Sequence, residues 1–411
     1  MTLVDAVVDR PVSRQTSEMI AAAQPQLEFL LASSRWAQRN RSPDGADFVA
    51  GNPQSVLPGY VQALESALTP RDDHWFGYKV SEATARRGAA AALRERRGSA
   101  YEADDIVMTN GAMAGLLGAL RTVVDPGDEV IFFKPSWFFY QALITACSAV
   151  AVPVMLSPPA FDLDLDRLRA AITPRTRAVI INSPNNPTGR IYPAEALITV
   201  GQLLTEAASR HGRAIFLISD EAYSRIVFDR SAYPSPAEYY ENSFLVYTYG
   251  KTLLTPGERL GYVALPPTMP HRAELRAALI ATLFLCGYAF PDAVLQRALP
   301  DLEQLCLDLG ALQRRRDRLV TALREQGYVL AVPEGAFYLL PKCPIPDDVA
   351  FADYLAQQDV YVLPGSLVDL PGYFRLSLTA SEEMIERGLP IFRKAMDLAP
   401  ALISPAQTGT Y

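Results

Sequence analysis

Residues 178–219 read AVIINSPNNPTGRIYPAEALITVGQLLTEAASRHGRAIFLIS, and this stretch decides the predicted fold. It begins and ends with short apolar, β-branched segments, AVIIN and AIFLIS, and a helical pattern, PAEALITVGQLLTEAASRHG, lies between them. Continuous hydrophobicity of this kind is typical of strands buried on both faces of a mostly parallel sheet, with the connecting segments covering it as helices. The stretch therefore predicts an α/β domain.

More apolar segments of the same kind extend the pattern from about residue 105 to residue 265. They are DIVMT (105–109), DEVIFF (128–133), AVAVPVM (149–155), SFLVYTY (243–249) and GYVAL (261–265). With the two segments quoted above they predict a mostly parallel, seven-stranded sheet flanked by helices.

The C-terminal part of the chain predicts a second, smaller unit. Residues 299–327 read as one long helix leading away from the sheet, and shorter strand and helix patterns follow, as in an α+β unit. We expect residues 1–60 to form an arm and part of this small domain, because they are too few for a core of their own. Residues 61–300 are then the large domain and residues 301–411 the rest of the small one.

Composition excludes several classes of function. The chain has 411 residues, 49% of them hydrophobic, and a formal charge of −7 with acidic and basic residues dispersed along it. Such a chain lacks the basic stripe that neutralises phosphates, so we expect no nucleic-acid partner. Neither a signal peptide nor an apolar run long enough to span a bilayer is found, which predicts a cytoplasmic protein without membrane contact.

The cysteines and histidines are scattered. No C-x-x-C or H-E-x-x-H spacing occurs, so we expect buried free thiols, no metal site and no zinc chemistry. A Ser-His-Asp hydrolase is also disfavoured, and protons in any reaction must be carried by other groups. The residues concerned are Cys147, Cys286, Cys306, Cys343, His74, His211 and His271.

Polar residues follow the predicted strands where each one ends, and ligands of doubly wound sheets bind at that edge. After DIVMT comes NGAMAGLLGAL, a glycine-containing turn that opens a helix and can hold an anion. Trp137 follows the next strand, and the rigid turn SPNNPTGRIY follows AVIIN. Taken singly, each of these features also fits an ordinary turn or a core aromatic residue.

Charged groups follow the later strands. Asp220 and Tyr223 come after AIFLIS, and Thr248, Lys251 and Arg259 lie in TYGKTLLTPGERLGY. An unpaired carboxylate is costly to bury, so we expect Asp220 to reach solvent or to meet a cation. Together, an anion cradle, an aromatic plate, a carboxylate and a lysine match the needs of pyridoxal 5′-phosphate, whose aldehyde condenses with an amine.

The sequence resembles the class I/II aminotransferases, the fold-type I pyridoxal-phosphate enzymes typified by aspartate aminotransferase, over nearly its whole length. The motifs that carry this resemblance occur together and in order, which makes it highly specific. They are GNPQSVLP (51–58), TNGAMAGL (109–116), PGDEVIFFKPSWFFY (126–140), SPNNPTG (183–189), SDEAYS (219–224), TYGKTLLTPGERLGY (248–262) and FRLSLTAS (374–381).

The resemblance implies a role for each matching residue. Lys251 forms the Schiff base with the cofactor, and Asp220 pairs with the pyridine nitrogen. Tyr223 and Asn186 bind the phenolic oxygen, and Trp137 stacks on the ring. On this interpretation Lys251, Asp220 and Tyr223 are the catalytic residues.

The resemblance also assigns the phosphate and the substrate. The phosphate is expected at the backbone of Gly111, Ala112 and Met113, the Thr248 hydroxyl and the Arg259 guanidinium. The substrate α-carboxylate is expected at Arg375 as a bidentate pair, with help from the backbone near Gly51 and from Asn186 and Trp137.

Family members work as homodimers, so we expect a homodimer here. The tyrosine that reaches the phosphate from the neighbouring subunit has its best counterpart at Tyr78, in a segment shorter than the family's usual form. Gly250 is a second departure, because the family commonly has a serine before the lysine.

The implied reaction moves an amino group between an L-amino acid and a 2-oxo acid, with Lys251 transferring the proton. The same residues also serve lyases and cyclising enzymes such as aminocyclopropane-carboxylate synthases, and a non-catalytic binding or regulatory relative is a third alternative. Dicarboxylate-specific relatives often use a second arginine, from the partner subunit, in the region that here reads FLCGYAFPDAVLQ (284–296), which has no basic residue. That difference favours an apolar, aromatic or unusual amino acid over aspartate.

Overall fold

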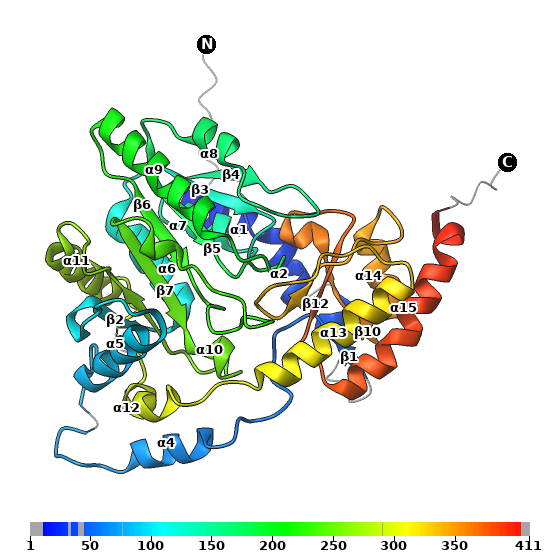
Figure 1. Ribbon diagram of the computed structural model, residues 1–411, viewed down its shortest axis with the longest axis horizontal. Coiled ribbons are helices and arrows are strands. Elements are labelled where there is room, and N and C mark those ends of the chain that lie inside the picture. The colour runs from blue at the N-terminus through cyan, green and yellow to red at the C-terminus, as the bar shows by residue number, and fades with distance from the viewer. Residues whose placement is uncertain (1–10, 32–33, 40–44, 76, 290, 404–411) are drawn as a thin grey trace.

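The computed structural model describes residues 11–31, 34–39, 45–75, 77–289 and 291–403, and its elements are shown in Figure 1. The helices are α1 (Arg14–Ala21), α2 (Gln24–Leu31), α3 (Arg35–Gln38), α4 (Tyr60–Leu68), α5 (Ala83–Arg97), η1 (Ala103–Asp105), α6 (Gly111–Val123), α7 (Tyr140–Ala146), α8 (Leu165–Ala171), α9 (Ala194–His211), η2 (Pro236–Glu238), α10 (Tyr249–Thr252), α11 (Arg272–Leu285), α12 (Ala293–Leu302), α13 (Leu309–Glu325), α14 (Asp348–Ala356), η3 (Gly365–Val368) and α15 (Glu382–Ile403). The strands are β1 (Ala46–Asp47), β2 (Ile106–Thr109), β3 (Glu129–Lys134), β4 (Val150–Met155), β5 (Thr176–Asn182), β6 (Phe216–Asp220), β7 (Ser243–Thr248), β8 (Gly261–Ala264), β9 (Tyr338–Leu339), β10 (Val360–Tyr361), β11 (Leu363–Pro364) and β12 (Phe374–Ser377).

The large sheet has seven strands in the order β2-β8-β7-β6-β5-β3-β4. Only β8 runs against its neighbours, because it pairs antiparallel with both β2 and β7 while the other pairs are parallel. The prediction of a mostly parallel, seven-stranded sheet is confirmed, and each of the seven apolar segments contains one strand.

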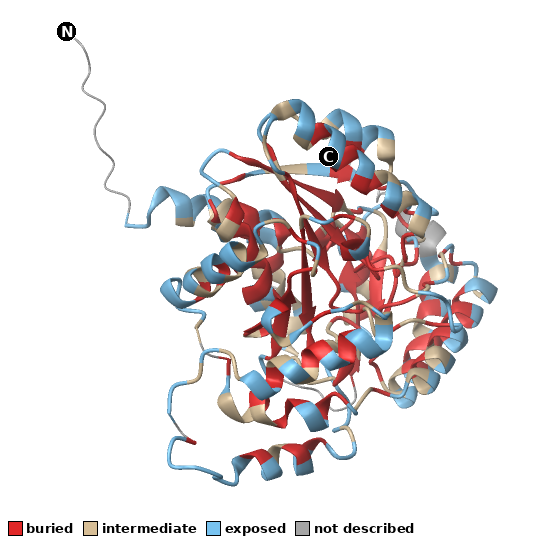
Figure 2. Ribbon diagram, turned by 60° about the vertical axis from the view of Figure 1, so that its left-hand side comes forward, coloured by how far each residue is buried: buried red, intermediate tan, exposed pale blue. Residues whose placement is uncertain are grey.

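Helices cover both faces of this sheet, as Figure 2 shows by the buried strands between them. On one face, side chains of α6, α7 and α11 pack against the strands in a single apolar cluster. On the other face, α5 and α12 cover the β2-β8-β7 end, and α8 and α9 cover the β3-β5-β6 part. The strand β4 differs from its expected burial because it is the edge strand, and most of its side chains are at least partly exposed.

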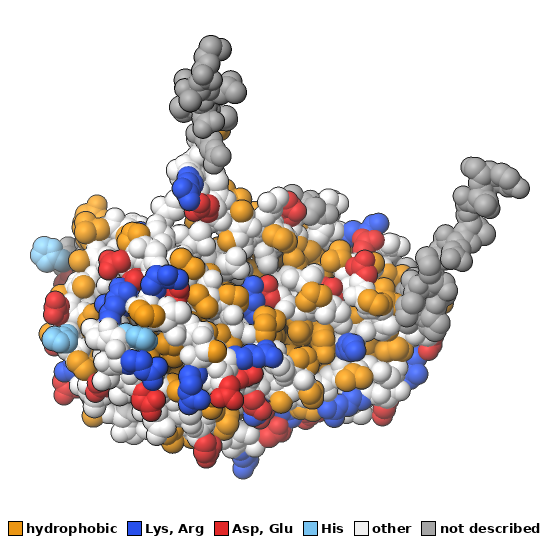
Figure 3. Space-filling view, turned by 90° about the horizontal axis from the view of Figure 1, so that it is seen from above, with side chains coloured by type: hydrophobic (Ala, Val, Ile, Leu, Met, Phe, Trp, Pro, Cys, Tyr) orange, Lys and Arg blue, Asp and Glu red, His pale blue; other side chains and the backbone are white. Residues whose placement is uncertain are grey.

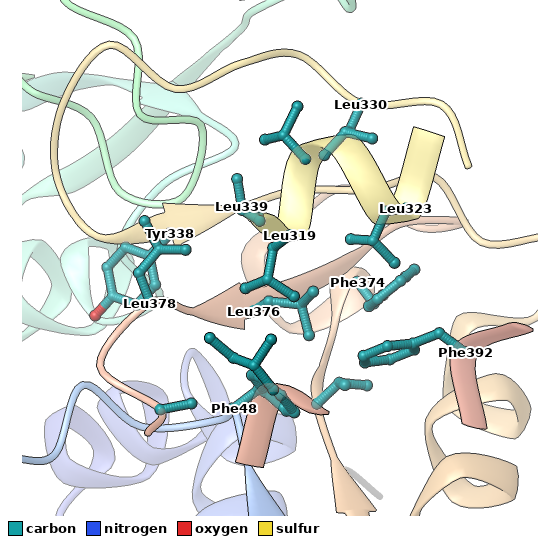
Figure 4. Close-up of a cluster of buried hydrophobic side chains, with 14 of the residues drawn as sticks. Phe48, Leu319, Leu323, Leu330, Tyr338, Leu339, Phe374, Leu376, Leu378 and Phe392 are labelled. Carbon is teal, nitrogen blue, oxygen red and sulfur yellow. The ribbon is translucent and has the colours of Figure 1, made fainter. Parts of the chain in front are cut away.

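The second unit has two small sheets and the helices α13, α14 and α15. The sheets are β11-β12-β9, which is antiparallel, and the parallel pair β1-β10. Figure 4 shows their shared core, in which Leu319 and Leu323 of α13 face Phe374 and Leu376 of β12. Phe48 and Phe392 belong to the same buried cluster. The pairing of β1 with β10 brings a segment from before the large sheet into this unit, whereas Gln15 of α1 donates to the Ala146 carbonyl at the end of α7.

The prediction of one helix over residues 299–327 is wrong. The segment contains two helices, because α12 ends at Leu302 and α13 begins at Leu309. Asp308 caps the second helix by accepting a hydrogen bond from the Ala311 amide. The Leu307 amide, which belongs to neither of these two helices, donates to the Thr252 carbonyl of α10 at 2.9 Å, so this connection also supports the helical turn that carries Lys251.

The surface charges and the burial of the cysteine thiols can both be compared with the sequence-based expectations, and only the thiols differ in part. Acidic and basic side chains are intermixed over the face seen in Figure 3. All four cysteines are free, but the expectation of buried thiols fails for Cys286, which is exposed at the end of α11, and Cys306 is half-buried. Among the described residues, no helix is both long and apolar enough to cross a membrane.

The contact of α9 with the loop before β7 depends on Gly201. A Cβ atom at this position would lie 2.2 Å from the Tyr239 carbonyl oxygen. We therefore predict that Gly201→Ala lowers the urea midpoint, with a loss of about 1–3 kcal/mol of stability, although alanine usually stabilises a helix relative to glycine. Gly257→Ala is the matched control, because nothing lies within 4 Å of its Cβ position. An unchanged or raised midpoint for Gly201→Ala would contradict the close approach.

Candidate functional site

A cleft opens at the carboxyl ends of the strands of the large sheet, where the second unit meets it. It encloses about 1100 Å³ that protein atoms do not fill, part of it open to solvent. Nearly all of the predicted site residues line it, although they come from widely separated segments. They are Gly51, Ala112, Met113, Trp137, Asn186, Asp220, Tyr223, Thr248, Lys251, Arg259 and Arg375.

Lys251 lies on α10, a single helical turn that directly follows β7. Thr248 caps this turn, its side chain accepting a hydrogen bond from the Gly250 amide. The lysine ammonium lies 6.0 Å from the ring centroid of Tyr223 and 5.8 Å from that of Phe337. A Cβ atom at position 250 would be 3.2 Å from the Thr255 carbonyl oxygen, so the loop leaves little room for the serine that is common in the family.

Asp220 ends β6 and is buried, with 5% of its surface exposed. Its carboxylate accepts hydrogen bonds from the Tyr140 hydroxyl, at 2.5 Å, and from the Ala222 amide, at 3.2 Å. Burial raises the pKa of Asp220 to about 6, although both hydrogen bonds and the positive charge of Lys251 act to lower it. The expected alternatives were solvent or a cation, but within the described chain a tyrosine hydroxyl holds this carboxylate.

Asn186 is positioned by a second asparagine, Asn182, at the end of β5. The Asn182 side chain accepts a hydrogen bond from the Asn186 amide at 2.7 Å and donates to the Asp220 carbonyl at 3.0 Å. The turn that carries Asn186 is thereby tied to the strand that carries Asp220.

Two tyrosine hydroxyls meet beside Lys251. The hydroxyl oxygens of Tyr223 and Tyr338 are 3.3 Å apart, and both side chains are buried. Burial, reinforced by Tyr338, raises the pKa of Tyr223 well above its usual value. Burial also acts to raise the pKa of Tyr338, but the positive charges of Arg375 and Lys251 outweigh it and lower that pKa. Tyr338 is therefore the more acidic of the pair, and Tyr223 remains a hydrogen-bond donor.

Arg375 of β12 faces the same space. Its Nη1 donates to Asn186 Oδ1 and its Nη2 to the Val49 carbonyl, each at 2.9 Å. The guanidinium carbon lies 4.1 Å from the ring centroid of Tyr338. Its Nε is buried without a hydrogen-bond partner in the described structure. A buried, unsatisfied donor on a cation is costly, so this group is suited to an anionic ligand.

The beginning of α6 has the features of an anion site. Asn110 precedes the helix but makes no capping hydrogen bond with its side chain, so the first amide groups remain available. Gly111 has φ +76°, and a Cβ atom there would lie 2.6 Å from Arg259 Nη2. Glycine at this position therefore allows the Arg259 guanidinium to approach the positive end of the helix.

Tyr78 is placed apart from the other predicted residues. Its side chain is 95% exposed and does not line the cleft of its own chain. Gly51 does line the cleft, where a Cβ atom would come 2.5 Å from the Phe337 ring.

Several residues that shape the site were not predicted from the sequence. Tyr140 and Asn182 had a signal, because both stand at the ends of predicted motifs, PSWFFY and AVIIN. Tyr338 had no such signal, because its part of the chain was predicted only to form an α+β unit. Their contacts with Asp220, Asn186 and Tyr223 cross between segments far apart in the chain.

Comparisons with known proteins agree with this geometry. The model of the family "Aminotransferase class I and II" matches residues 47–391. The aspartate/prephenate aminotransferase of Thermus thermophilus is 29% identical over 94% of this chain and 100% of its own length. A crystal structure of an amino transferase from Eubacterium rectale has a TM-score of 0.82 at 31% identity, covering 94% of this chain and 96% of its own. The Thermus thermophilus aspartate aminotransferase with maleate has a TM-score of 0.78 at 29% identity, covering 94% and 100%.

The chain therefore belongs to the class I and II aminotransferase family and has its fold-type I architecture. It is an aminotransferase, a transferase of amino groups.

The raised pKa of the buried Asp220 carboxyl group implies that the stability of the protein depends on pH. Its pKa of about 6 lies above the value of 3.8 for an unperturbed aspartate. The stability that this group contributes is thus fully present below about pH 4 and is lost as the pH rises to about 6. At pH 8 the loss is on the order of 3 kcal/mol. We predict that Asp220→Asn stabilises the cofactor-free protein against urea, by more at pH 8 than at pH 5.

Urea midpoints of both proteins at the two pH values test this prediction. The amide keeps the volume of the side chain and an oxygen for Tyr140. An Asp220→Asn protein less stable than the parent at pH 8 would contradict a net cost of the ionised carboxylate at this position.

Proposed function

We propose that this chain uses pyridoxal 5′-phosphate to transfer the amino group of an L-amino acid to a 2-oxo acid, with Lys251 as the covalent attachment residue. The observation that carries the proposal is the convergence on one cleft of an amine, a buried carboxylate, an uncapped helix start and a buried cation. The bound cofactor would supply an aldehyde for the amine and a ring that accepts electrons.

The residues fit this cofactor at both of its ends. The start of α6 and Arg259 suit a phosphate, and Thr248 lines the same cleft. At the other end, a carboxyl group with a raised pKa is stabilised in its ionised form by a cationic partner, such as a protonated ring nitrogen beside Asp220. Tyr223, which retains its proton, and Asn186 would donate to the phenolic oxygen between them, and Trp137 would provide a stacking surface.

In the reaction, Arg375 would bind the substrate α-carboxylate through its unpaired Nε and an Nη atom. Asn186 Oδ1 and the Val49 carbonyl fix the guanidinium in place, and this fixed position would present the α-carbon to Lys251. Lys251 Nζ would act as a general base by taking the proton from that carbon, and then as a general acid by delivering the proton to a different atom. The Tyr338 ring beneath the guanidinium would help hold it in position.

We also propose that the chain works as a cytoplasmic homodimer, with residues 61–300 as its large domain. Four free cysteines fit a reducing compartment. Phe284, Leu285 and Tyr288 at the end of α11 are 52%, 80% and 37% exposed and offer apolar surface for an interface. Tyr78 would then act at the phosphate of the neighbouring subunit.

The attachment residue can be mapped directly. Borohydride reduction of the cofactor-loaded protein should fix about one pyridoxyl group per chain, on the peptide that contains Lys251. Lys251→Ala should take up no label and should lose turnover. A label on Lys134 or Lys342 would overturn the assignment. If the amino acid is consumed while the 2-oxo acid gains no amino group, the reaction is elimination or cyclisation instead.

The shared site can be tested by mixing chains. Light scattering of the loaded protein should give about twice the chain mass, since stable dimers bury on the order of 2,000 Å². Lys251→Ala and Tyr78→Ala chains should regain activity when refolded together, because each mixed dimer has one site with both residues. Random pairing limits the recovery to about a quarter of the sites. A fully active monomer, or mixtures no better than their parents, would refute this arrangement.

A further inference from the structure

Part of the cleft lining is apolar. Besides the charged and amide side chains already described, the lining includes four hydrocarbon and aromatic side chains from the second unit and from the segment after β3. We call them the apolar wall, and its members are Leu30, Val49, Phe138 and Leu363.

The apolar wall is a packed structure. Val49 and Leu363 are 1% exposed and belong to one buried cluster, against which Phe138 packs. Phe138 follows β3 of the large sheet, while Leu363 belongs to β11 of the small one. The wall is thus built from both units, and a ligand in contact with it touches both.

The wall begins beside the guanidinium that we assign to the substrate carboxylate. Leu363 lies directly opposite Arg375 in the antiparallel register of β11 and β12, so the two side chains are neighbours on one face. The backbone of Val49 also contacts Arg375, because its carbonyl accepts a hydrogen bond from Arg375 Nη2. A substrate held by its α-carboxylate at Arg375 therefore has its side chain within reach of this wall.

The charges of the cleft are already assigned under the proposed function. Lys251 is assigned to covalent attachment of the cofactor, Arg259 is assigned to the phosphate, and Arg375 is assigned to the substrate α-carboxylate. In the parts of the chain that the structure describes, the cleft is lined by no other cation. Among the groups of its own chain, a carboxylate on the substrate side chain would thus find no cation beside the apolar wall, and leaving an ion unpaired there is strongly unfavourable.

We propose that the preferred amino donor carries an apolar side chain of branched aliphatic or aromatic type, which packs against the joint surface of Phe138, Val49 and Leu363. This inference rests on the proposed function and names its substrate class. It separates the chain from relatives described as aspartate aminotransferases, of which one was solved with the dicarboxylate maleate. An apolar side chain would also extend the contact between the two units, whereas a carboxylate would interrupt it.

The first test measures substrate preference in single turnovers. The cofactor-loaded protein is mixed with L-leucine, L-phenylalanine, L-aspartate or L-alanine, and conversion of the cofactor is followed by absorbance. The best apolar donor should have a second-order rate constant at least about tenfold above that of aspartate, since small differences in an apolar pocket give about 10- to 200-fold discrimination. Faster conversion of aspartate would overturn the inference while leaving the proposed function intact. No conversion with any amino acid would overturn both.

The second test uses variants of adjacent phenylalanines. Phe138→Ala should reduce the rate constant with leucine or phenylalanine by about tenfold more than that with alanine, because only the larger side chains reach the wall. Phe139→Ala is the matched control. Its ring lies 4.6 Å from that of Phe138 but does not line the cleft, so the ratio between substrates should stay constant. Equal losses for all substrates in Phe138→Ala would contradict a contact with the substrate side chain.

A binding measurement separates recognition from chemistry. Calorimetric titration of the loaded protein with 3-phenylpropanoate should give a Kd at least about tenfold below that for maleate, and Phe138→Ala should reduce this difference. Tighter binding of maleate would show that a cation, supplied by another subunit or by another part of the chain, serves the substrate side chain. That result would overturn the inference.

Discussion

The arrangement of the site depends on a carboxylate that is held away from water. Asp220 is buried at the end of a central strand, and a protein interior opposes its charge. Tyr140, at the start of α7, and the Ala222 amide each give it a hydrogen bond, but neither carries a positive charge. The fold thus places an ionisable group in surroundings that favour a positively charged ligand. Without such a ligand, the buried carboxylate lowers the stability of the protein. Functional sites commonly combine desolvation and a specific partner in this way.

The second requirement is that distant parts of the chain meet at Arg375. Its guanidinium contacts Asn186, from the turn after β5, and Val49, from the segment that follows β1. The Lys134–Asp369 ion pair, at 2.9 Å, makes a further connection between the large sheet and the second unit. Contacts of this kind fix the relative position of the two walls of the cleft, so the geometry of the site depends on the docking of the two units as well as on the sheet.

The sequence alone predicted the sheet because buried parallel strands have a recognisable pattern. All seven apolar segments contain strands, and the polar residues after them converge because parallel strands end at a common edge. Prediction failed where tertiary contacts decide the local structure. Two contacts accompany the break between α12 and α13. Asp308 caps α13, and the Leu307 amide donates to the carbonyl of Thr252 in the helical turn that carries Lys251. Neither contact alters the apolar periodicity of the sequence. Tyr140 and Tyr338 were missed for a similar reason, since a tyrosine has the same appearance in the sequence whether it packs in a core or places its hydroxyl beside Asp220 or Tyr223.

The reversed strand β8 has a consequence for the variation that this fold can tolerate. Thr248 at the end of β7 pairs with Gly261 at the start of β8, and the residues between them include both Lys251 and Arg259. The amine and the guanidinium therefore belong to one hairpin connection, whereas Asp220, Asn186 and the start of α6 follow separate strands. Insertions or deletions within residues 252–258 would change the distance between this amine and this guanidinium. Changes of length in the other connections, such as the one from α9 to β6, leave that distance unaltered, so length variation among descendants of this chain should accumulate there.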